Sequence, residues 1–229
     1  MNEAKRLKVD TPDLFAFVKD GSKTLSQAKR EYNQRTMVEP QAIAGRYRVW
    51  YADPPWQYSD SGLDNYGHAE GHYTTMSTDA ICDMGDEIKA ACDEKAVLFL
   101  WVTAPMLPEG LQVVQAWNFQ YKGHFIWDKM KHNFGHYNSV QHELLLIATK
   151  GSCTPDVPKL FDSVVEEERS NIHSRKPDIF REIIDTIYPH GNRIELFARQ
   201  KAEGWESWGA DVSQCPQHCD TVEKGAKVA

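Results

Sequence analysis

Two hydrophobic periods alternate along this chain. Continuous apolar runs predict strands that are buried on both faces of a sheet, whereas apolar residues three or four apart predict helices with one buried side. The predicted strands are residues 47–52, 96–102, 121–127, 144–148 and 192–199, with an edge strand in 161–169. The predicted helices run from Ser77 or Thr78 to about Cys92, from Pro105 through Leu107, Leu111, Val114 and Trp117, and from Pro177 through Phe180, Ile183, Ile184 and Ile187. This alternation predicts an α/β fold with a mostly parallel sheet and helices on both faces.

The first 45 residues are polar and have no clear core in their pattern. Thr24 and Gln27 have the spacing of a capping box, which predicts one helix running to about Arg35. We therefore expect three parts: a polar leader at 1–45, a main domain at 46–212 and a flexible tail at 213–229.

Composition sets limits on what the chain does. Its 229 residues suffice for one sizeable core and a short appendage. The sequence has no apolar run near the roughly 18 residues of a membrane span and no secretory signal pattern, so we expect no membrane partner. Five scattered cysteines indicate a reducing compartment, and hence a cytoplasmic protein. The net charge of −7 gives no global attraction to nucleic acid, so such a contact must use local basic patches.

The first predicted strand runs into Asp53-Pro54-Pro55-Trp56. Two prolines make a stiff, extended corner, since each fixes φ and lacks an amide hydrogen. We expect the carbonyls beside the prolines to have no adjacent amide donor. With the acceptor-only carboxylate of Asp53 and the flat ring of Trp56, they suit a planar group that bears an NH2. The alternative interpretation is a plain turn that ends the strand.

This arrangement fits the chemistry of the adenine exocyclic amine, whose lone pair is delocalised into the ring. The Asp53 carboxylate and the Pro54 carbonyl can each accept one of its N–H groups. The nitrogen then becomes pyramidal and its lone pair points at an electrophile, which is catalysis by orientation and preorganised dipoles.

Two long polar segments are predicted to be loops. Residues 57–75 read as a lid over the target base, with Tyr73 as a stacking or gating ring. Residues 130–141 read as a second loop, in which Lys129 at its edge and Tyr137 contact a nucleic-acid backbone and unstacked bases. The alternative is that the aromatic residues only anchor this loop.

Several motifs together resemble the S-adenosylmethionine-dependent adenine-N6 methyltransferases related to the catalytic subunit of the eukaryotic mRNA adenosine methyltransferase. The resemblance extends from about Tyr47 to Asp211. Besides the Asp53 corner it includes Tyr73-Thr74-Thr75-Met76, residues 98–103, His142-Glu143, residues 174–178 and residues 194–199. It implies a Rossmann-like fold with a circularly permuted strand order, in which the tips of the first and last strands lie side by side at a topological switch point.

The resemblance also implies roles for single residues. Lys176, just before a predicted helix, matches the position that holds the methionine carboxylate of the cofactor, and a helix amino terminus favours an anion there. Arg199 matches the residue near the cofactor ribose. His173, Asp211 and Asp53 are the remaining cofactor-binding candidates. His142-Glu143 lies near the site by resemblance, and its alternative reading is a hydrogen-bonded pair that fixes a loop.

No metal site is predicted. His68 and His72 are four apart, but the surrounding glycines argue against the helix that this spacing requires. The tail segment Cys215-Pro216-Gln217-His218-Cys219 supplies at most three ligands, whereas a structural zinc site usually takes four.

The expected function is methyl transfer from S-adenosylmethionine to the N6 amine of adenine in nucleic acid. Asp53, Pro54, Pro55 and Trp56 are the expected catalytic residues. DNA is favoured over RNA, because the short chain without appended RNA-binding modules is similar to bacterial and phage members of the family. The alternatives are an RNA adenosine N6-methyltransferase, amino methylation of cytosine, and a non-catalytic nucleic-acid-binding subunit, which Ala210 would suit where relatives often carry asparagine. A homo- or hetero-oligomer is left open.

Overall fold

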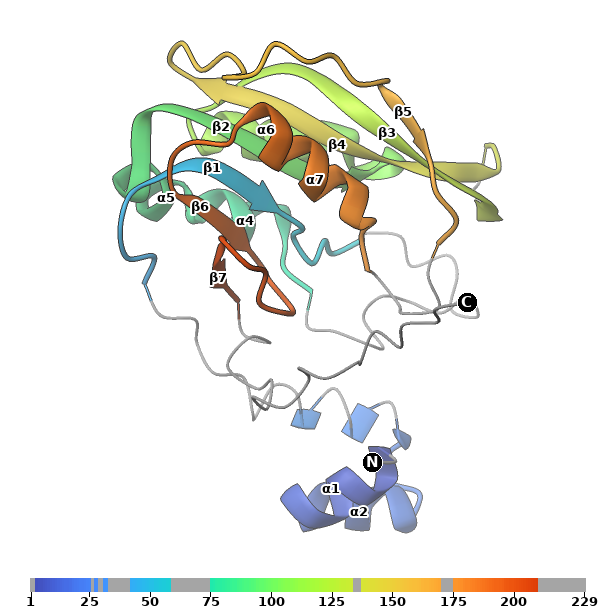
Figure 1. Ribbon diagram of the computed structural model, residues 1–229. Helices are drawn as coiled ribbons and strands as arrows, with labels where there is room; N and C mark the ends of the chain where they lie inside the picture. The colour runs from blue at the N-terminus through green and yellow to red at the C-terminus, as the bar shows by residue number, and fades with distance from the viewer. Residues whose placement is uncertain are drawn as a thin grey trace, which may run out of the picture.

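Seven strands in the described part of the chain form one mixed sheet at the centre of the computed structural model (Figure 1). The structure describes residues 3–25, 27–28, 31–32, 42–58, 75–133, 137–169 and 175–209. The strands are β1 Tyr47–Ala52, β2 Cys92–Thr103, β3 Gln120–Asn133, β4 Val140–Lys150, β5 Val164–Glu166, β6 Arg193–Leu196 and β7 Glu206–Trp208. Their order across the sheet is β5-β3-β4-β2-β1-β6-β7. The first strand therefore lies near the middle of the sheet.

The sheet is mostly parallel, as expected. β1 pairs in parallel with β2 on one side and with β6 on the other, so that Ala52 lies beside both Leu100 and Leu196. The β3–β5 and β6–β7 pairs are also parallel, and only β4 runs antiparallel to its neighbours β2 and β3. The carboxyl ends of β1 and β6 thus lie side by side, which confirms the expected meeting of the first and last strand tips.

Helices cover both faces of this sheet, which confirms the predicted layers (Figure 1). The helices α4 Thr78–Asp83, α5 Gly85–Ala91 and α6 Leu107–Ala116 pack on one face, and α7 Asp178–Ile187 packs on the other. Alternate residues of β2 pack into the apolar clusters on the two faces of the sheet, because successive side chains of a strand point to opposite faces. Among the described residues, no helix combines the length and the apolar character that a membrane span requires.

The helix predicted over residues 77–92 is interrupted at Met84, where α4 ends and α5 begins. The Ser77 side chain accepts a hydrogen bond from the Ala80 amide and caps α4, as predicted. Gly85 begins α5 against the end of α6, where a Cβ atom would lie 2.6 Å from the Ala116 carbonyl oxygen. The two short helices therefore bend around α6.

The buried side of α6 differs from the prediction. A short 3₁₀ turn, Ala104–Met106, precedes the helix, and the side chain of Leu111 is 38% exposed. Gly110 faces the sheet in its place, where a Cβ atom would lie 2.4 Å from Cγ1 of Val102. The absence of a side chain at Gly110 lets α6 approach β2 closely, and this rotates Leu111 towards solvent.

The leader contains more helix than the sequence pattern indicated. Helices α1 Glu3–Asp10 and α2 Pro12–Lys19 precede the predicted capping box, which is present: the Thr24 amide donates to Oε1 of Gln27 at 2.8 Å, and the Gln27 amide donates to Oγ1 of Thr24 at 3.2 Å. The helical segments share a small apolar cluster of Leu7, Leu14, Ala28 and Tyr32. The expectation of a leader with no core is wrong here, because these four residues come from separate segments. The boundaries at residues 45 and 212 stay predictions.

Candidate active site

The site is built on the corner that follows β1. The Trp56 amide donates to the Pro54 carbonyl at 2.9 Å, and the Met76 amide donates to the Pro55 carbonyl at 2.8 Å. The expectation that both carbonyls lack an amide donor is therefore wrong, because the chain returns at Met76 and closes the corner. Each carbonyl oxygen has two lone pairs, so the Pro54 oxygen keeps the capacity to accept a further hydrogen bond.

Trp56 is a core residue more than an open surface. It is 6% exposed, and its indole Nε1 donates to the main-chain oxygen of Trp101 at 3.0 Å. This hydrogen bond fixes the corner to β2. The expected catalytic role of Trp56 stays a prediction, since most of its ring is already covered.

Asp53 belongs to a chain of four charged side chains. Nζ of Lys176 lies 2.8 Å from Oδ1 and 2.9 Å from Oδ2 of Asp53, and 3.2 Å from Oε2 of Glu143. The other oxygen of Glu143, Oε1, accepts from Nζ of Lys129 at 2.5 Å. We call Asp53, Lys176, Glu143 and Lys129 the charge network. Its two carboxylates and two ammonium groups add to zero net charge.

The network is shielded from solvent, and this strengthens its internal attractions. Side-chain exposure is 19% for Asp53, 14% for Lys176, 13% for Glu143 and 6% for Lys129. Burial would raise the pKa of Glu143, but Lys176 and Lys129 together hold that pKa below its ordinary value. Burial would likewise lower the pKa of Lys176, and Asp53 and Glu143 outweigh it and raise that pKa. Glu143 and Lys176 are therefore both charged at neutral pH.

The sheet topology brings the network together. Asp53 directly follows β1, and Glu143 lies near the start of antiparallel β4, so both reach the same edge of the sheet. Lys176 stands just before α7, and its ammonium lies 5.3 Å from the centre of the Trp101 ring. The site therefore lies on the face that α7 covers, at the carboxyl ends of β1 and β2.

The structure differs from the expected place of Lys129 and from the alternative pairing of Glu143 with His142. β3 continues to Asn133, so Lys129 lies within a strand and is buried, not at the edge of a loop. Glu143 bonds to the two lysines and not to His142, because neighbouring residues of a strand point to opposite faces. Glu143 therefore lies in the site, as the resemblance implied, and what the pattern missed is its pairing with Lys129 and Lys176. Its signal was a carboxylate at the start of a continuous apolar strand.

Comparison with known proteins identifies the family of the chain. A family model described as MT-A70 matches residues 47–211, which contain the whole charge network. The chain belongs to the MT-A70 family. The predicted resemblance and the Rossmann-like fold are confirmed, and the protein is a methyltransferase.

Named relatives of this MT-A70 chain fall into two groups. It is 32% identical over 193 residues to the Type II methyltransferase M.MunI of Mycoplasma sp, across 76% of this chain and 82% of that protein. It is 28% identical over 172 residues to the N(6)-adenosine-methyltransferase catalytic subunit METTL3 of Homo sapiens, across 69% of this chain and 26% of that protein. A putative N(6)-adenosine-methyltransferase MT-A70-like protein of Medicago truncatula is 29% identical over 215 residues, across 83% of this chain and 32% of that protein. The chain thus spans most of the first relative and about a quarter to a third of the others.

The strand predicted over residues 192–199 of the MT-A70 chain is shorter in the structure. β6 ends at Leu196, because Phe197 adopts a left-handed φ of 61° that a strand does not permit. Arg199 follows, half-buried, beyond the strand end that adjoins β1. Within β6, Glu195 accepts a hydrogen bond from Arg181 of α7 at 2.8 Å, which joins the helix to the strand. The ribose contact of Arg199 stays a prediction.

The remaining candidates are divided between exposed and undescribed positions. Tyr137, just before β4, is fully exposed, and its contact with substrate stays a prediction. Several residues that the sequence singled out lie outside the described residues: Tyr73, His173, Asp211, His68, His72, Ala210 and Cys215–Cys219. Within the described ranges, no cluster of three histidine, cysteine, aspartate or glutamate side chains is placed to bind a metal ion.

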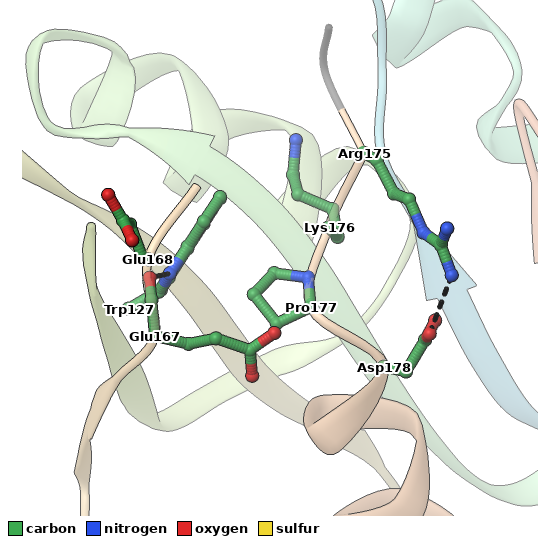
Figure 2. Close-up of a pocket in the computed structure, with 7 residues that line it drawn as sticks. All are labelled: Trp127, Glu167, Glu168, Arg175, Lys176, Pro177 and Asp178. Carbon is green, nitrogen blue, oxygen red and sulfur yellow. Dashed lines mark hydrogen bonds and ion pairs between the residues drawn. The ribbon is translucent and has the colours of Figure 1, made fainter. Parts of the chain in front are cut away.

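A cavity of about 240 Å³ opens beside Lys176 (Figure 2). Figure 2 shows it between the segment that follows β5 and the segment that enters α7, with Trp127 at the β3 side. The lining residues are Trp127, Glu167, Glu168, Arg175, Lys176, Pro177 and Asp178. This lining offers cations and carboxylates close together, a donor set that suits a zwitterionic amino-acid group such as the methionine end of S-adenosylmethionine.

Proposed function

We propose that this methyltransferase transfers a methyl group from S-adenosylmethionine to the exocyclic N6 amine of adenine in DNA. The observation that carries the proposal is the position of Asp53, a shielded carboxylate at the tip of β1 whose two oxygens are fixed by Lys176. DNA is favoured because the chain matches 82% of a type II methyltransferase but only 26% of an adenosine-methyltransferase catalytic subunit.

The residues of the corner would prepare the amine for attack. Asp53 and the Pro54 carbonyl each accept one N–H, and the nitrogen lone pair turns away from the adenine ring. When bound, S-adenosylmethionine supplies the electrophilic methyl group. The methyl group would move from the sulfur to the amine nitrogen, the cofactor would leave as S-adenosylhomocysteine, and the proton that the amine loses would pass to water. In duplex DNA the base must first leave the stack, which costs a few kcal/mol.

Lys176 would serve both halves of this site. Its ammonium orients Asp53, and it lines the cavity whose mixed charges suit the methionine end of the cofactor. Glu143 and Lys129 would hold Lys176 in place from behind. Arg199 would approach the cofactor ribose from the neighbouring strand end.

A methyl-transfer assay with labelled S-adenosylmethionine tests the proposal. Duplex DNA, single-stranded DNA and RNA of mixed sequence are offered separately, and mass spectrometry identifies the methylated nucleoside after digestion. We expect N6-methyldeoxyadenosine from DNA. Methyladenosine from RNA alone would replace the substrate class, and methylcytosine would replace the target base. No product together with no cofactor binding would support the non-catalytic subunit instead.

A further inference from the structure

Tyr58 extends the active-site corner towards β2. It stands two residues after Trp56, and its phenolic oxygen lies 2.9 Å from Oγ1 of Thr103, the last residue of β2. Thr103 occupies the residue before the 3₁₀ turn, where a threonine side chain commonly caps the turn, but here it makes no capping bond. The Thr103 hydroxyl is directed to Tyr58 instead.

The strand register connects this hydroxyl pair to the charge network. Thr103 is the direct partner of Glu143 across the antiparallel β2–β4 ladder, so their side chains lie on the same face. Glu143 contacts Lys176, and Lys176 contacts Asp53. Asp53 and Tyr58 lie at the two ends of the same short chain segment, which contains the corner. The five residues thus surround one place at the edge of the sheet.

The phenol of Tyr58 lies within electrostatic reach of that place. Burial raises its pKa, the Thr103 bond lowers it, and the charges of Glu143, Lys176 and Asp53 each act on it. The phenol therefore stays protonated at neutral pH. The residue as a whole is 38% exposed, so part of Tyr58 remains open to a ligand while its hydroxyl contacts Thr103.

We infer that Tyr58 is a substrate-contact residue: its hydroxyl, held by Thr103, donates a hydrogen bond to a ring nitrogen beside the target amine. The inference rests on the proposed function, since it takes the base bound at Asp53 to be adenine. Two hydroxyls carry two protons, and only one is used between them. Either oxygen of this contact could be the donor. We assign Thr103 as the donor to Tyr58, which leaves the phenol proton to donate outwards and strengthens both bonds.

Adenine offers an acceptor at the required place. Its N1 and N7 are unprotonated nitrogens that flank the exocyclic amine, one on each edge of the base. A donor at one of them fixes the rotation of the ring about the two N–H bonds that Asp53 and Pro54 accept. Tyr58 would in this way orient the base as well as bind it.

The test pairs a protein change with a ligand change. We measure by NMR titration the binding of deoxyadenosine monophosphate and of its 1-deaza and 7-deaza analogues to wild type and Tyr58→Phe. Loss of one neutral hydrogen bond weakens binding by about fivefold to tenfold. Wild type should bind one of the two analogues more weakly than the natural nucleotide, by this factor. Tyr58→Phe should bind the natural nucleotide more weakly than wild type does, by the same factor. It should bind that analogue no more weakly than it binds the natural nucleotide.

Tyr121→Phe is the matched control, because Tyr121 is 39% exposed and its hydroxyl also bonds a side chain, Nδ1 of His124. It should bind all three nucleotides as wild type does. Equal losses for Tyr58→Phe with all three nucleotides would overturn the inference and leave a corner-fastening role. Methyl transfer is measured in a separate assay. If the Tyr58→Phe change and the deaza change depend on each other as predicted but DNA is not methylated, only the proposed function is refuted. If DNA is methylated but the two changes act independently, only this inference is refuted.

Discussion

Removing the Glu143 carboxylate should destabilise the fold severely. In Glu143→Gln, the buried amino group of Lys129, whose side chain is 6% exposed, loses its carboxylate partner at 2.5 Å. Lys176 loses one of its two carboxylates. Breaking a buried ion pair by removing one partner costs about 3–5 kcal/mol, because a charge is left without compensation. We take about 3 kcal/mol, since glutamine retains one acceptor oxygen.

This loss corresponds to a large shift in melting temperature. For a domain of this size, each kcal/mol shifts Tm by about 2–4 °C, so Glu143→Gln should melt about 6–12 °C below wild type. The matched control is Asp93→Asn. Asp93 pairs with Arg46 at 3.4 Å, and their side chains are 39% and 58% exposed. A surface pair of this kind is worth about 0–1 kcal/mol, so the control should melt within about 4 °C of wild type.

The pH dependence of the difference identifies its cause. The pKa of Glu143 is lowered in the folded state from its ordinary 4.5, so its stabilisation is complete above that value. The stabilisation by Glu143 is lost as pH falls through the pKa that Glu143 has in the folded state. The gap in stability between wild type and Glu143→Gln should therefore be constant from about pH 5 to 8 and narrow below about pH 4.5.

A double variant completes the experiment. Lys129→Met combined with Glu143→Gln removes the ammonium that the single variant leaves unpaired, so it should recover part of the lost stability. Thermal melts followed by circular dichroism measure all four proteins. A Glu143→Gln melt that matches the Asp93→Asn melt would refute the reasoning, as would a gap that stays constant below pH 4.

Two further predictions concern cofactor binding and packing. Lys176→Met should weaken binding of S-adenosylmethionine at least tenfold by isothermal titration calorimetry, about 1.4 kcal/mol, through loss of the cation beside the cavity, while exposed Lys201→Met should not. Unchanged affinity in Lys176→Met would remove that lysine from the cofactor site. Gly110→Ala should lower stability by about 1–3 kcal/mol in urea unfolding, because its Cβ would lie 2.4 Å from Val102 Cγ1. An unchanged unfolding midpoint would show that α6 moves away at little cost.

Most of the sheet could be predicted from the sequence because its longer strands carry strong local signals, whereas the three-residue strand β7 was not predicted. The apolar run in β2 and the helical spacing in α7 each determine their own structure, and the prolines mark the end of β1. Weaker patterns failed for physical reasons. Leu111 fits a helical stripe, but a glycine one position earlier decides which side of α6 faces the sheet.

The charge network was only half visible in the sequence. Asp53 and Lys176 occur in motifs, whereas the pairing of Lys129 with Glu143 depends on the register between β3 and β4. The length of β3 also hid it, since a polar stretch reads as a loop until its partner strand is known. The capping box at Thr24 was found because its two bonds join residues three apart, while the cluster around Leu7 and Tyr32 joins distant segments.

The central claim is that the Asp53 carboxylate orients the target amine. Single-turnover methyl transfer to DNA measures it most directly, with Asp53→Ala set against Asp93→Ala, whose carboxylate lies at the start of β2. The account predicts a rate about a hundredfold to a thousandfold lower for Asp53→Ala, with affinity for S-adenosylmethionine within a few fold of wild type. A rate for Asp53→Ala close to those of wild type and Asp93→Ala would contradict it.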